Sequence, residues 1–324
     1  MERRNPKISV ILVCYNQEDV IERALNSVLI QKKYLFELII SDDCSPDNTW
    51  SIIKRYEQEY PDIIKAYRHE KNLGAYENIQ STYNKINGEI VFFLSGDDSF
   101  GTELFKKTCE AVFGKNLDYK NDRFCVITDF AVINGENEQI VINRNILVQK
   151  HDPFSLKFRG IIYNRALGES ISTFNDRKVA YIARKKNASI PTSLQEGYTD
   201  IIPFYHTKFF FYLPYLGNYY YSGIGVSSKV VKHKKEYLEG LIEYCDTIPN
   251  YFTNLNQFDK NWLIFHKAKT EYLLNPNLGR LWKYFINFSI LSKDPLRNFF
   301  LMKEIKTFLL ETFNFIKNKP QNAQ

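Results

Sequence analysis

Two pairs of adjacent aspartates carry the clearest chemical signal in this sequence of 324 residues. Asp97 and Asp98 follow the apolar run EIVFFL, and Asp42 and Asp43 follow the run LFELIIS. Adjacent carboxylates at the end of a buried strand repel one another and are costly to desolvate. A divalent cation such as Mg²⁺ or Mn²⁺ relieves that cost through hard oxygen ligands. Asp97 and Asp98 therefore indicate a metal site, and a helix N-cap at Asp98 or Ser99 is the alternative interpretation.

Asp43 and Tyr15 are candidates for contacts with a nucleotide. A carboxylate at Asp43 can accept a hydrogen bond from a base N–H or a ribose hydroxyl. Its alternative role is in capping the helix that begins near Asp47. Tyr15 could stack on a planar base, or it is an ordinary tyrosine at a strand end. Gly96 favours a ligand site beside Asp97, because glycine permits close approach to the backbone.

Strands and helices alternate over the first 130 or so residues and must position these side chains. Continuous apolar runs predict strands at 7–15, 35–41, 63–68, 89–94 and 124–133, and helical periods predict helices at 20–31, 45–60, 75–86 and 103–113. Continuous apolar strands that alternate with helices are typical of a parallel sheet covered on both faces. Ligands bind such sheets at the C-terminal ends of the strands. We therefore expect Tyr15, Asp43, Asn72 and the Asp97–Asp98 pair at one rim.

Composition and charge limit the class of protein. Hydrophobic residues make up 44% of the chain, which excludes global disorder. The net charge of +6 arises in residues 227–324, which hold 15 Lys and Arg against nine Asp and Glu. Basic residues so mixed with acids do not favour a nucleic-acid partner. The five cysteines form no C-x-x-C pair, which predicts reduced thiols in the cytoplasm.

The sequence predicts two regions, residues 1–226 and a helical, basic and aromatic region at 227–324. A signal peptide is not expected, because the N-terminal apolar run at 8–13 is too short and no small-residue cleavage site follows it. A transmembrane helix is not expected either, because the charge-free run 209–228 contains proline, glycine and asparagine. In the C-terminal region an apolar stripe lies between lysines, comprising Met302, Ile305, Leu309, Phe313 and Ile316. Such a stripe either packs against the chain or a second copy, or contacts anionic lipid.

Several familiar motifs are absent from the sequence. It contains no G-x-x-x-x-G-K-[ST] loop, no G-x-G-x-x-G between a strand and a helix, and no G-x-S-x-G. Phosphate binding by a glycine-rich loop is therefore not expected, and a bound metal would have to neutralise a phosphate.

Four segments in order, SVILVCYNQEDVIERALNSVLIQ, FELIISDDCSPDNT, EKNLGAYEN and GEIVFFLSGDD, resemble family 2 glycosyltransferases. The resemblance is strong over residues 6–135, moderate over 195–228 and lost after about 230. It implies an α/β protein with the GT-A fold, which is a Rossmann-like mixed sheet with helices on both faces, here followed by a helical C-terminal region. Residues 1–226 would form the catalytic domain.

The resemblance also implies roles for the residues at the rim. Tyr15 and Asp43 would flank the uracil or ribose of a nucleotide-sugar donor, with Val13, Cys14 and the loop of Asn72 close by. Asp97 would lie near the ribose and, with Asp98, near the divalent metal, Mn²⁺ or Mg²⁺. The sequence departs from the family at Val13, where Thr or Pro is frequent, and at Ser95, where Asp is frequent.

Inverting members of the family have a general base about 100 residues beyond the metal motif. The segment GYTDIIPFYH places this base at Asp200, with Glu196 as the second candidate. A helix cap is the alternative role of Asp200. The family usually has an arginine and a histidine further downstream, but this sequence has Tyr220, Tyr221 and Gly223 there. His206 is a candidate to contact the donor in their place, and a structural histidine is the alternative.

The resemblance therefore implies an inverting hexosyltransferase that moves a sugar, from UDP by family habit, to a glycan or lipid-linked acceptor in capsule, O-antigen or lipopolysaccharide synthesis. The expected location is the cytoplasm or the inner face of the cell membrane, with a homodimer as a further possibility. Two alternatives remain open. One is a non-catalytic scaffold of a synthesis complex, and the other is a sugar nucleotidyltransferase.

Overall fold

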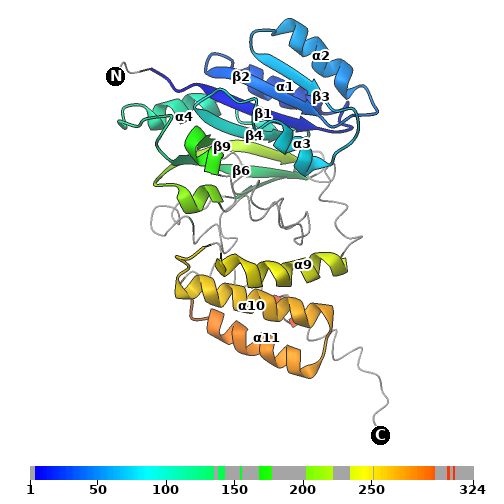
Figure 1. Ribbon diagram of the computed structural model, residues 1–324, viewed down its shortest axis with the longest axis vertical. Helices are drawn as coiled ribbons and strands as arrows, with labels where there is room; N and C mark the ends of the chain where they lie inside the picture. The colour runs from blue at the N-terminus through cyan, green and yellow to red at the C-terminus, as the bar shows by residue number, and fades with distance from the viewer. Residues whose placement is uncertain are drawn as a thin grey trace. The chain divides into compact units, whose positions relative to one another are not determined.

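The computed structural model describes residues 4–134, 138–142, 154, 168–176, 202–221, 234–250, 252–295, 305–306 and 309–310. These residues form two compact units, coloured in chain order in Figure 1. Unit 1 holds the residues up to 142 together with 168–176 and 202–221. Unit 2 holds Phe154 and the residues from 234 onward. The boundary predicted after residue 226 falls outside the described residues.

Four parallel strands form one half of the sheet in unit 1. They are β1 (Ile8–Cys14), β2 (Leu35–Asp42), β3 (Ile64–Arg68) and β4 (Ile90–Ser95), in the spatial order β3-β2-β1-β4. All four coincide with predicted strands, because continuous apolar runs of this length favour strands buried on both faces.

The other half makes the sheet mixed, so the predicted GT-A-type mixed sheet is confirmed. Its strands are β5 (Ser99–Phe100), β6 (Phe124–Asn134), β7 (Glu138–Ile142), β8 (Gly168–Ser170) and β9 (Phe209–Tyr221). The short β8 lies antiparallel between β4 and β6, and β9 runs parallel to β6. The apolar runs alone indicated only parallel strands, because three-residue β8 and two-residue β5 give no apolar run to recognise.

Helices cover both faces of the sheet (Figure 1). On one face, α1 (Ile21–Leu29), α2 (Thr49–Glu59) and α4 (Leu104–Val112) share one hydrophobic cluster with alternate residues of β1 such as Val10 and Leu12. On the other face, α3 (Ala75–Ser81) contributes Ile79 to a cluster around Ile11. A fully buried side chain of this size contributes about 1.5–3 kcal/mol. Burial on both faces therefore fixes the position of each strand, and the residues that follow its C-terminal end lie at the rim.

Unit 2 is helical over its described residues. It comprises α9 (Lys234–Thr247), the 3₁₀ turn η2 (Ile248–Asn250), α10 (Gln257–Leu274) and α11 (Leu278–Leu291). Asn256 and Asp259 form a capping box at the start of α10, and α10 packs on α11 through Phe265 and the fully buried Tyr284. Within the described part of the chain, no helix is long and apolar enough to cross a membrane.

Candidate active site

The register of the sheet brings the acidic loops together at one rim. Cys14 pairs with Asp42 on one side of β1, and Val13 pairs with Ser95 on the other. The chain leaves β1 toward β2 and returns to β4 on the opposite side, so a topological switch point lies between β1 and β4. In open α/β sheets this crevice, at the C-terminal ends of the strands, is where ligands bind.

Asp97 and Asp98 lie in a tight turn after β4. Their exposed fractions are only 7% and 5%. The hydroxyl of Ser95 donates to a carboxylate oxygen of Asp97, and the N–H of Asp98 donates to the carbonyl of Ser95 at 3.0 Å. The N–H of Tyr221, at the end of β9, donates to Oδ1 of Asp98 at 3.3 Å. Ser95, which departs from the family pattern, therefore orients the neighbouring aspartate.

The alternative role of this pair as a helix cap is not realised. The residues after Asp98 form the short strand β5, and α4 begins only at Leu104. The expectation that Gly96 makes room for a ligand is also corrected. A Cβ at Gly96 would lie 2.3 Å from Oε1 of Gln17 and 2.8 Å from Cδ1 of Ile21, so protein side chains fill the space expected for a ligand.

Asp43 holds the loop that follows β3. Its carboxylate is 2% exposed and accepts hydrogen bonds from the N–H groups of Leu73 at 2.7 Å and Gly74 at 2.8 Å. Gly74 has φ of +86°, a left-handed conformation that glycine adopts without strain. The side chain of Asn72 is exposed, and its Oδ1 accepts from the same Gly74 N–H at 3.0 Å. Asp43 and the Asn72 loop are thus brought together.

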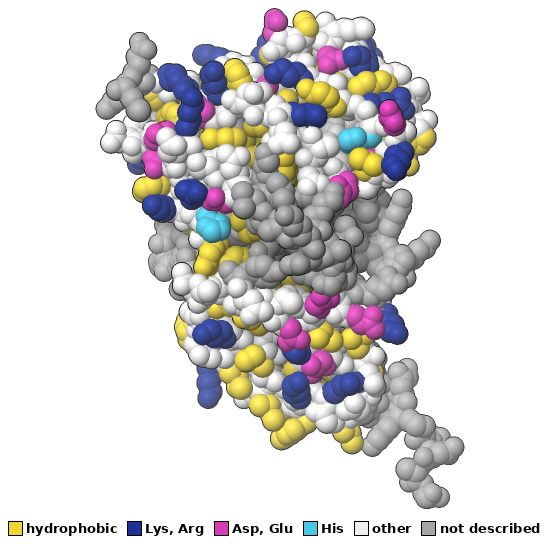
Figure 2. All heavy atoms as spheres, viewed as in Figure 1, with side chains coloured by type: hydrophobic (Ala, Val, Ile, Leu, Met, Phe, Trp, Pro, Cys, Tyr) yellow, Lys and Arg dark blue, Asp and Glu magenta, His cyan; other side chains and the backbone are white. Residues whose placement is uncertain are grey.

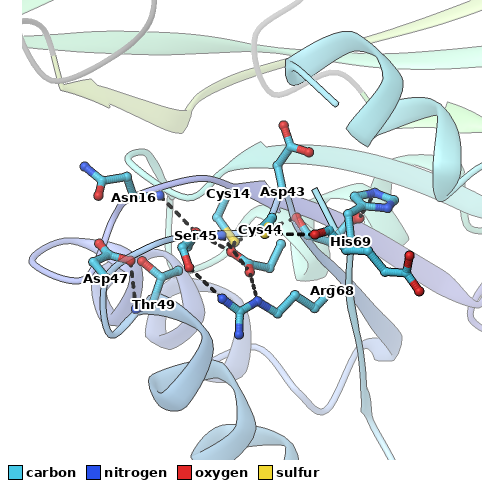
Figure 3. A network of polar contacts seen from close by, with 12 residues as sticks. Cys14, Asn16, Asp43, Cys44, Ser45, Asp47, Thr49, Arg68 and His69 are labelled. Carbon is cyan, nitrogen blue, oxygen red and sulfur yellow. Dashed lines mark hydrogen bonds and ion pairs between the residues drawn. The ribbon is translucent and has the colours of Figure 1, made fainter. Parts of the chain in front are cut away.

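Asp42, the other member of this pair, is fully buried and neutralised by an arginine that the sequence analysis did not single out. Nε of Arg68 lies 3.2 Å from Oδ2 of Asp42. Nη2 of Arg68 donates to the carbonyl of Ser45 at 2.7 Å, and Figure 3 shows Arg68 pointing toward Ser45. The N–H of Ser45 also donates to Asp42 at 3.1 Å. Arg68 ends β3, and the register pairs it with Asp42, which is the signal that could have identified it.

Cys14 is a neutral thiol beneath the rim. Burial, together with the negative charge and hydrogen bond of Asp42, raises the pKa of the Cys14 thiol well above 9.0. The carbonyls of Val13 and Cys14 accept from the N–H groups of Gly96 at 2.9 Å and Asp43 at 3.0 Å. Each of these two carbonyls therefore already accepts a hydrogen bond from the protein backbone.

The loop after β1 is fastened to the loop after β2. The N–H groups of Asn16, Gln17 and Glu18 donate to the side chains of Ser45, Thr49 and Asp47 at 2.9, 2.8 and 2.9 Å. Burial opposes ionisation of Asp47, but its hydrogen bonds from Thr49 and Glu18 prevail and lower its pKa. Between these fixed points Tyr15 is 45% exposed, so its ring is free to meet a planar group.

Two of the predicted residues cannot be placed. Asp200 and Glu196, the candidate bases, lie outside the described residues. His206 is described and exposed, with its ring against Tyr205.

Asp97 and Asp98 would supply two carboxylate ligands to a divalent cation whose other ligands are not protein side chains. Among the described residues, no three His, Cys, Asp or Glu side chains form a metal-binding group. Mg²⁺ and similar ions at phosphate sites take one or two protein carboxylates and fill the other positions with phosphate oxygens and water. Two adjacent buried aspartates supply that number of carboxylates.

The sequence is similar to known glycosyltransferases. Residues 9–165 match the sequence model of glycosyl transferase family 2. A processive diacylglycerol beta-glycosyltransferase of Mycoplasma pneumoniae is 27% identical over 158 residues, 48% of this chain and 43% of that protein. A poly(ribitol-phosphate) beta-glucosyltransferase of Bacillus spizizenii is 30% identical over 99 residues, 30% of this chain and 16% of that protein. The matches span less than half the length of these two curated relatives.

Solved structures share the fold. Residues 1–349 of S. aureus TarS in complex with UDP-GlcNAc superpose with a TM-score of 0.61 at 15% identity, covering 98% of this chain and 94% of that one. The mannosyltransferase PcManGT from Pyrobaculum calidifontis, in complex with GDP-Man and Mn²⁺, gives 0.52 at 13% identity, covering 99% and 89%. The GT-A fold is therefore shared, and residues 9–165 of this chain carry the sequence pattern of glycosyl transferase family 2.

Proposed function

We propose that this chain is an inverting glycosyltransferase that moves a sugar from a nucleoside diphosphate, with UDP favoured, to a glycan or lipid-linked acceptor of a cell-surface polysaccharide. The observation that carries the proposal is the buried Asp97–Asp98 turn at the β1/β4 switch point. The match to glycosyl transferase family 2, and two relatives whose names include diacylglycerol and poly(ribitol-phosphate), support the acceptor class.

The described residues have distinct tasks in this proposal. Tyr15 stacks on the base, while the loop that Asp43 holds closes the far side of the nucleotide pocket. Asp97 and Asp98 hold Mn²⁺ or Mg²⁺, which when bound offsets negative charge on the leaving nucleoside diphosphate. Two solved structures named above support these ligand classes: TarS in complex with UDP-GlcNAc, and PcManGT in complex with GDP-Man and Mn²⁺.

The proposed base accepts the proton of the acceptor hydroxyl as that oxygen attacks the anomeric carbon from the face opposite the diphosphate. A single displacement of this kind inverts the configuration of the sugar. We propose Asp200 for this role, and Glu196 as the second candidate. A positioned base typically contributes a factor of about 10²–10⁴.

A donor panel tests the proposal. UDP-sugars and GDP-sugars are incubated with the full chain in Mn²⁺ or EDTA, and release and binding of nucleotide are both measured. We expect metal-dependent release from one donor, its loss in Asp98→Asn and Asp200→Asn, and its retention in the exposed control Asp62→Asn. Binding without release, even with lipid-linked and polyol-phosphate acceptors added, would favour a scaffold, and absence of binding would overturn the proposal. Release of pyrophosphate from a nucleoside triphosphate and a sugar phosphate would indicate the nucleotidyltransferase.

Unit 2 offers a surface for the proposed contact with the inner face of the cell membrane. One side of α11 packs on α10, while Leu278, Trp282 and Phe285 on its other side are 62%, 63% and 44% exposed. Figure 2 shows hydrophobic side chains at the surface of this unit. The sequence of α11 has Arg280 and Lys283 and no acidic residue. Aromatic and apolar groups beside basic ones suit an anionic lipid surface.

Vesicle sedimentation tests this contact. The full chain should bind phosphatidylglycerol-containing vesicles more tightly than phosphatidylcholine vesicles. The double variant Trp282→Ser/Phe285→Ser should bind the two kinds of vesicle equally weakly. Phe113→Ser, which changes an exposed aromatic residue of unit 1, is the matched control. Equal binding of variant and wild type would overturn the proposal. A dimer in solution that the double variant abolishes would instead assign the face to a second copy.

A further inference from the structure

Arg23 lies against the aspartate turn, although it comes from α1, 74 residues earlier in the sequence. Its Nη2 donates to the backbone carbonyl of Asp97 at 2.5 Å. Its guanidinium carbon lies 3.4 Å from the centroid of the Tyr221 ring. Arg23 thus contacts both the turn after β4 and the end of β9.

Tyr221 meets the same turn from the other side. Its N–H donates to Oδ1 of Asp98 at 3.3 Å, and its hydroxyl lies 3.5 Å from the hydroxyl of Ser99. Arg23 therefore holds Asp97, and the backbone of Tyr221 holds Asp98, while the Arg23 guanidinium stacks on the Tyr221 ring. Tyr221 is placed by its pairing with Ile133 in β6.

Arg23 contacts the backbone of the turn and not its acidic groups. Arg23 bonds the carbonyl of Asp97, not its carboxylate, so it fixes the backbone without occupying the acidic oxygens. A guanidinium can stack with its flat face and donate in its plane at the same time, which an ammonium cannot. Among the described residues, the Nε–H of Arg23 is buried without a hydrogen-bond partner, so the side chain is held here by the stack and the single carbonyl bond.

We propose that Arg23 is a positioning residue, which together with the ring of Tyr221 holds the Asp97–Asp98 turn in the conformation that binds metal and donor diphosphate. This inference rests on the function proposed above. It assigns the arginine of the first helix a role in the affinity of the aspartate pair, with no direct part in the transfer of the sugar.

The test compares Mn²⁺ binding and backbone protection across matched variants of the full chain. Arg23→Met removes the charge and the planar group, Arg23→Lys keeps only the charge, Tyr221→Leu removes the ring, and Tyr221→Phe keeps it. Arg55→Gln changes an exposed arginine paired with Glu22, and serves as the control. Mn²⁺ affinity is titrated in the presence of UDP, and exchange of the Asp98 amide is measured without ligand.

We expect Arg23→Met and Tyr221→Leu to weaken Mn²⁺ binding about tenfold, the scale on which groups behind a metal ligand act. Arg23→Lys should recover little of this loss, Tyr221→Phe should bind as the wild type does, and the double variant should be no weaker than either single variant. In both weakened variants the Asp98 amide should exchange faster than in Arg55→Gln.

Unchanged Mn²⁺ affinity in Arg23→Met, with affinity lost in Asp98→Asn, would overturn the positioning role and leave the proposed function standing. Failure of the wild type itself to bind Mn²⁺ with UDP would overturn both. A fall in melting temperature with unaltered affinity and unaltered Asp98 exchange would assign Arg23 to stability alone and would also overturn the proposal.

Discussion

Oδ2 of Asp43 lies 2.8 Å from the backbone nitrogen of Gly74, 31 residues away in the sequence. With the bond of its other oxygen to Leu73, the carboxylate of Asp43 fastens the end of β2 to the loop after β3. The aspartate predicted to meet the nucleotide therefore also fixes the loop that we propose as a wall of the nucleotide pocket.

Replacing Asp43 should affect stability and nucleotide binding together. Asp43→Ala leaves two N–H groups without this acceptor, and we expect a loss of about 1–3 kcal/mol in unfolding free energy. The affinity for UDP should fall as the loop loosens. Denaturant unfolding and calorimetric titration measure the two effects, with Asp62→Asn as the control. Full UDP affinity in a measurably destabilised Asp43→Ala would contradict the role of this loop in the pocket.

Arg68 should matter because it neutralises a carboxylate that solvent does not reach. Arg68→Met leaves the fully buried Asp42 with uncompensated charge. Since the Arg68 side chain is 38% exposed, we expect a loss of about 2–3 kcal/mol, below the range for wholly buried pairs. Asp42→Asn combined with Arg68→Met should recover part of it, as urea unfolding can show. Strict additivity of the two changes would argue against a coupled pair.

Acid should weaken unit 1 through Glu37, a buried glutamate near the N-terminal end of β2. Burial opposes ionisation of Glu37, but hydrogen bonds from Asn87, Ser9 and Lys65 prevail and lower its pKa below 4.5. A lowered carboxyl pKa stabilises the fold above the unfolded value, and this contribution is lost as pH falls through the folded value.

Glu37→Gln should therefore be less stable than the wild type at pH 7, and the difference should narrow toward pH 3. Thermal unfolding across this range measures it, and the exposed Glu110→Gln should follow the wild type throughout. A gap between Glu37→Gln and wild type that stays constant with pH would show that the carboxylate is not the cause.

Thiol labelling should distinguish Cys44 from the other four cysteines. Cys14, Cys109, Cys125 and Cys245 are buried, and burial raises the pKa of Cys109 to about 11 and that of Cys245 to about 12. Cys44 is partly exposed in the loop after β2. Mass spectrometry after brief iodoacetamide treatment at pH 8 should find Cys44 modified first, and Cys44→Ser should be nearly inert. Early modification of Cys14 would contradict its burial under the rim.

Local sequence accounts for much of unit 1. The strands β1 to β4 and the helices between them follow from apolar runs and helical periods, which depend on neighbours a few residues apart. The position of Asp43, Asp97 and Asp98 after those strands was predictable for the same reason, since parallel strands bring their C-terminal ends to one rim. The resemblance to family 2 glycosyltransferases rested on these same segments.

Only the tertiary structure decided which partners these side chains meet. The contacts of Arg23 with Asp97 and of Tyr221 with Asp98 join residues 74 and 123 positions apart. They depend on how α1 packs on the sheet and on the insertion of β8 and β9 beyond β4, which no local period encodes. The sequence thus determined which groups stand at the rim, whereas long-range packing decided which of them are held by other protein groups and which, like Tyr15, are left exposed.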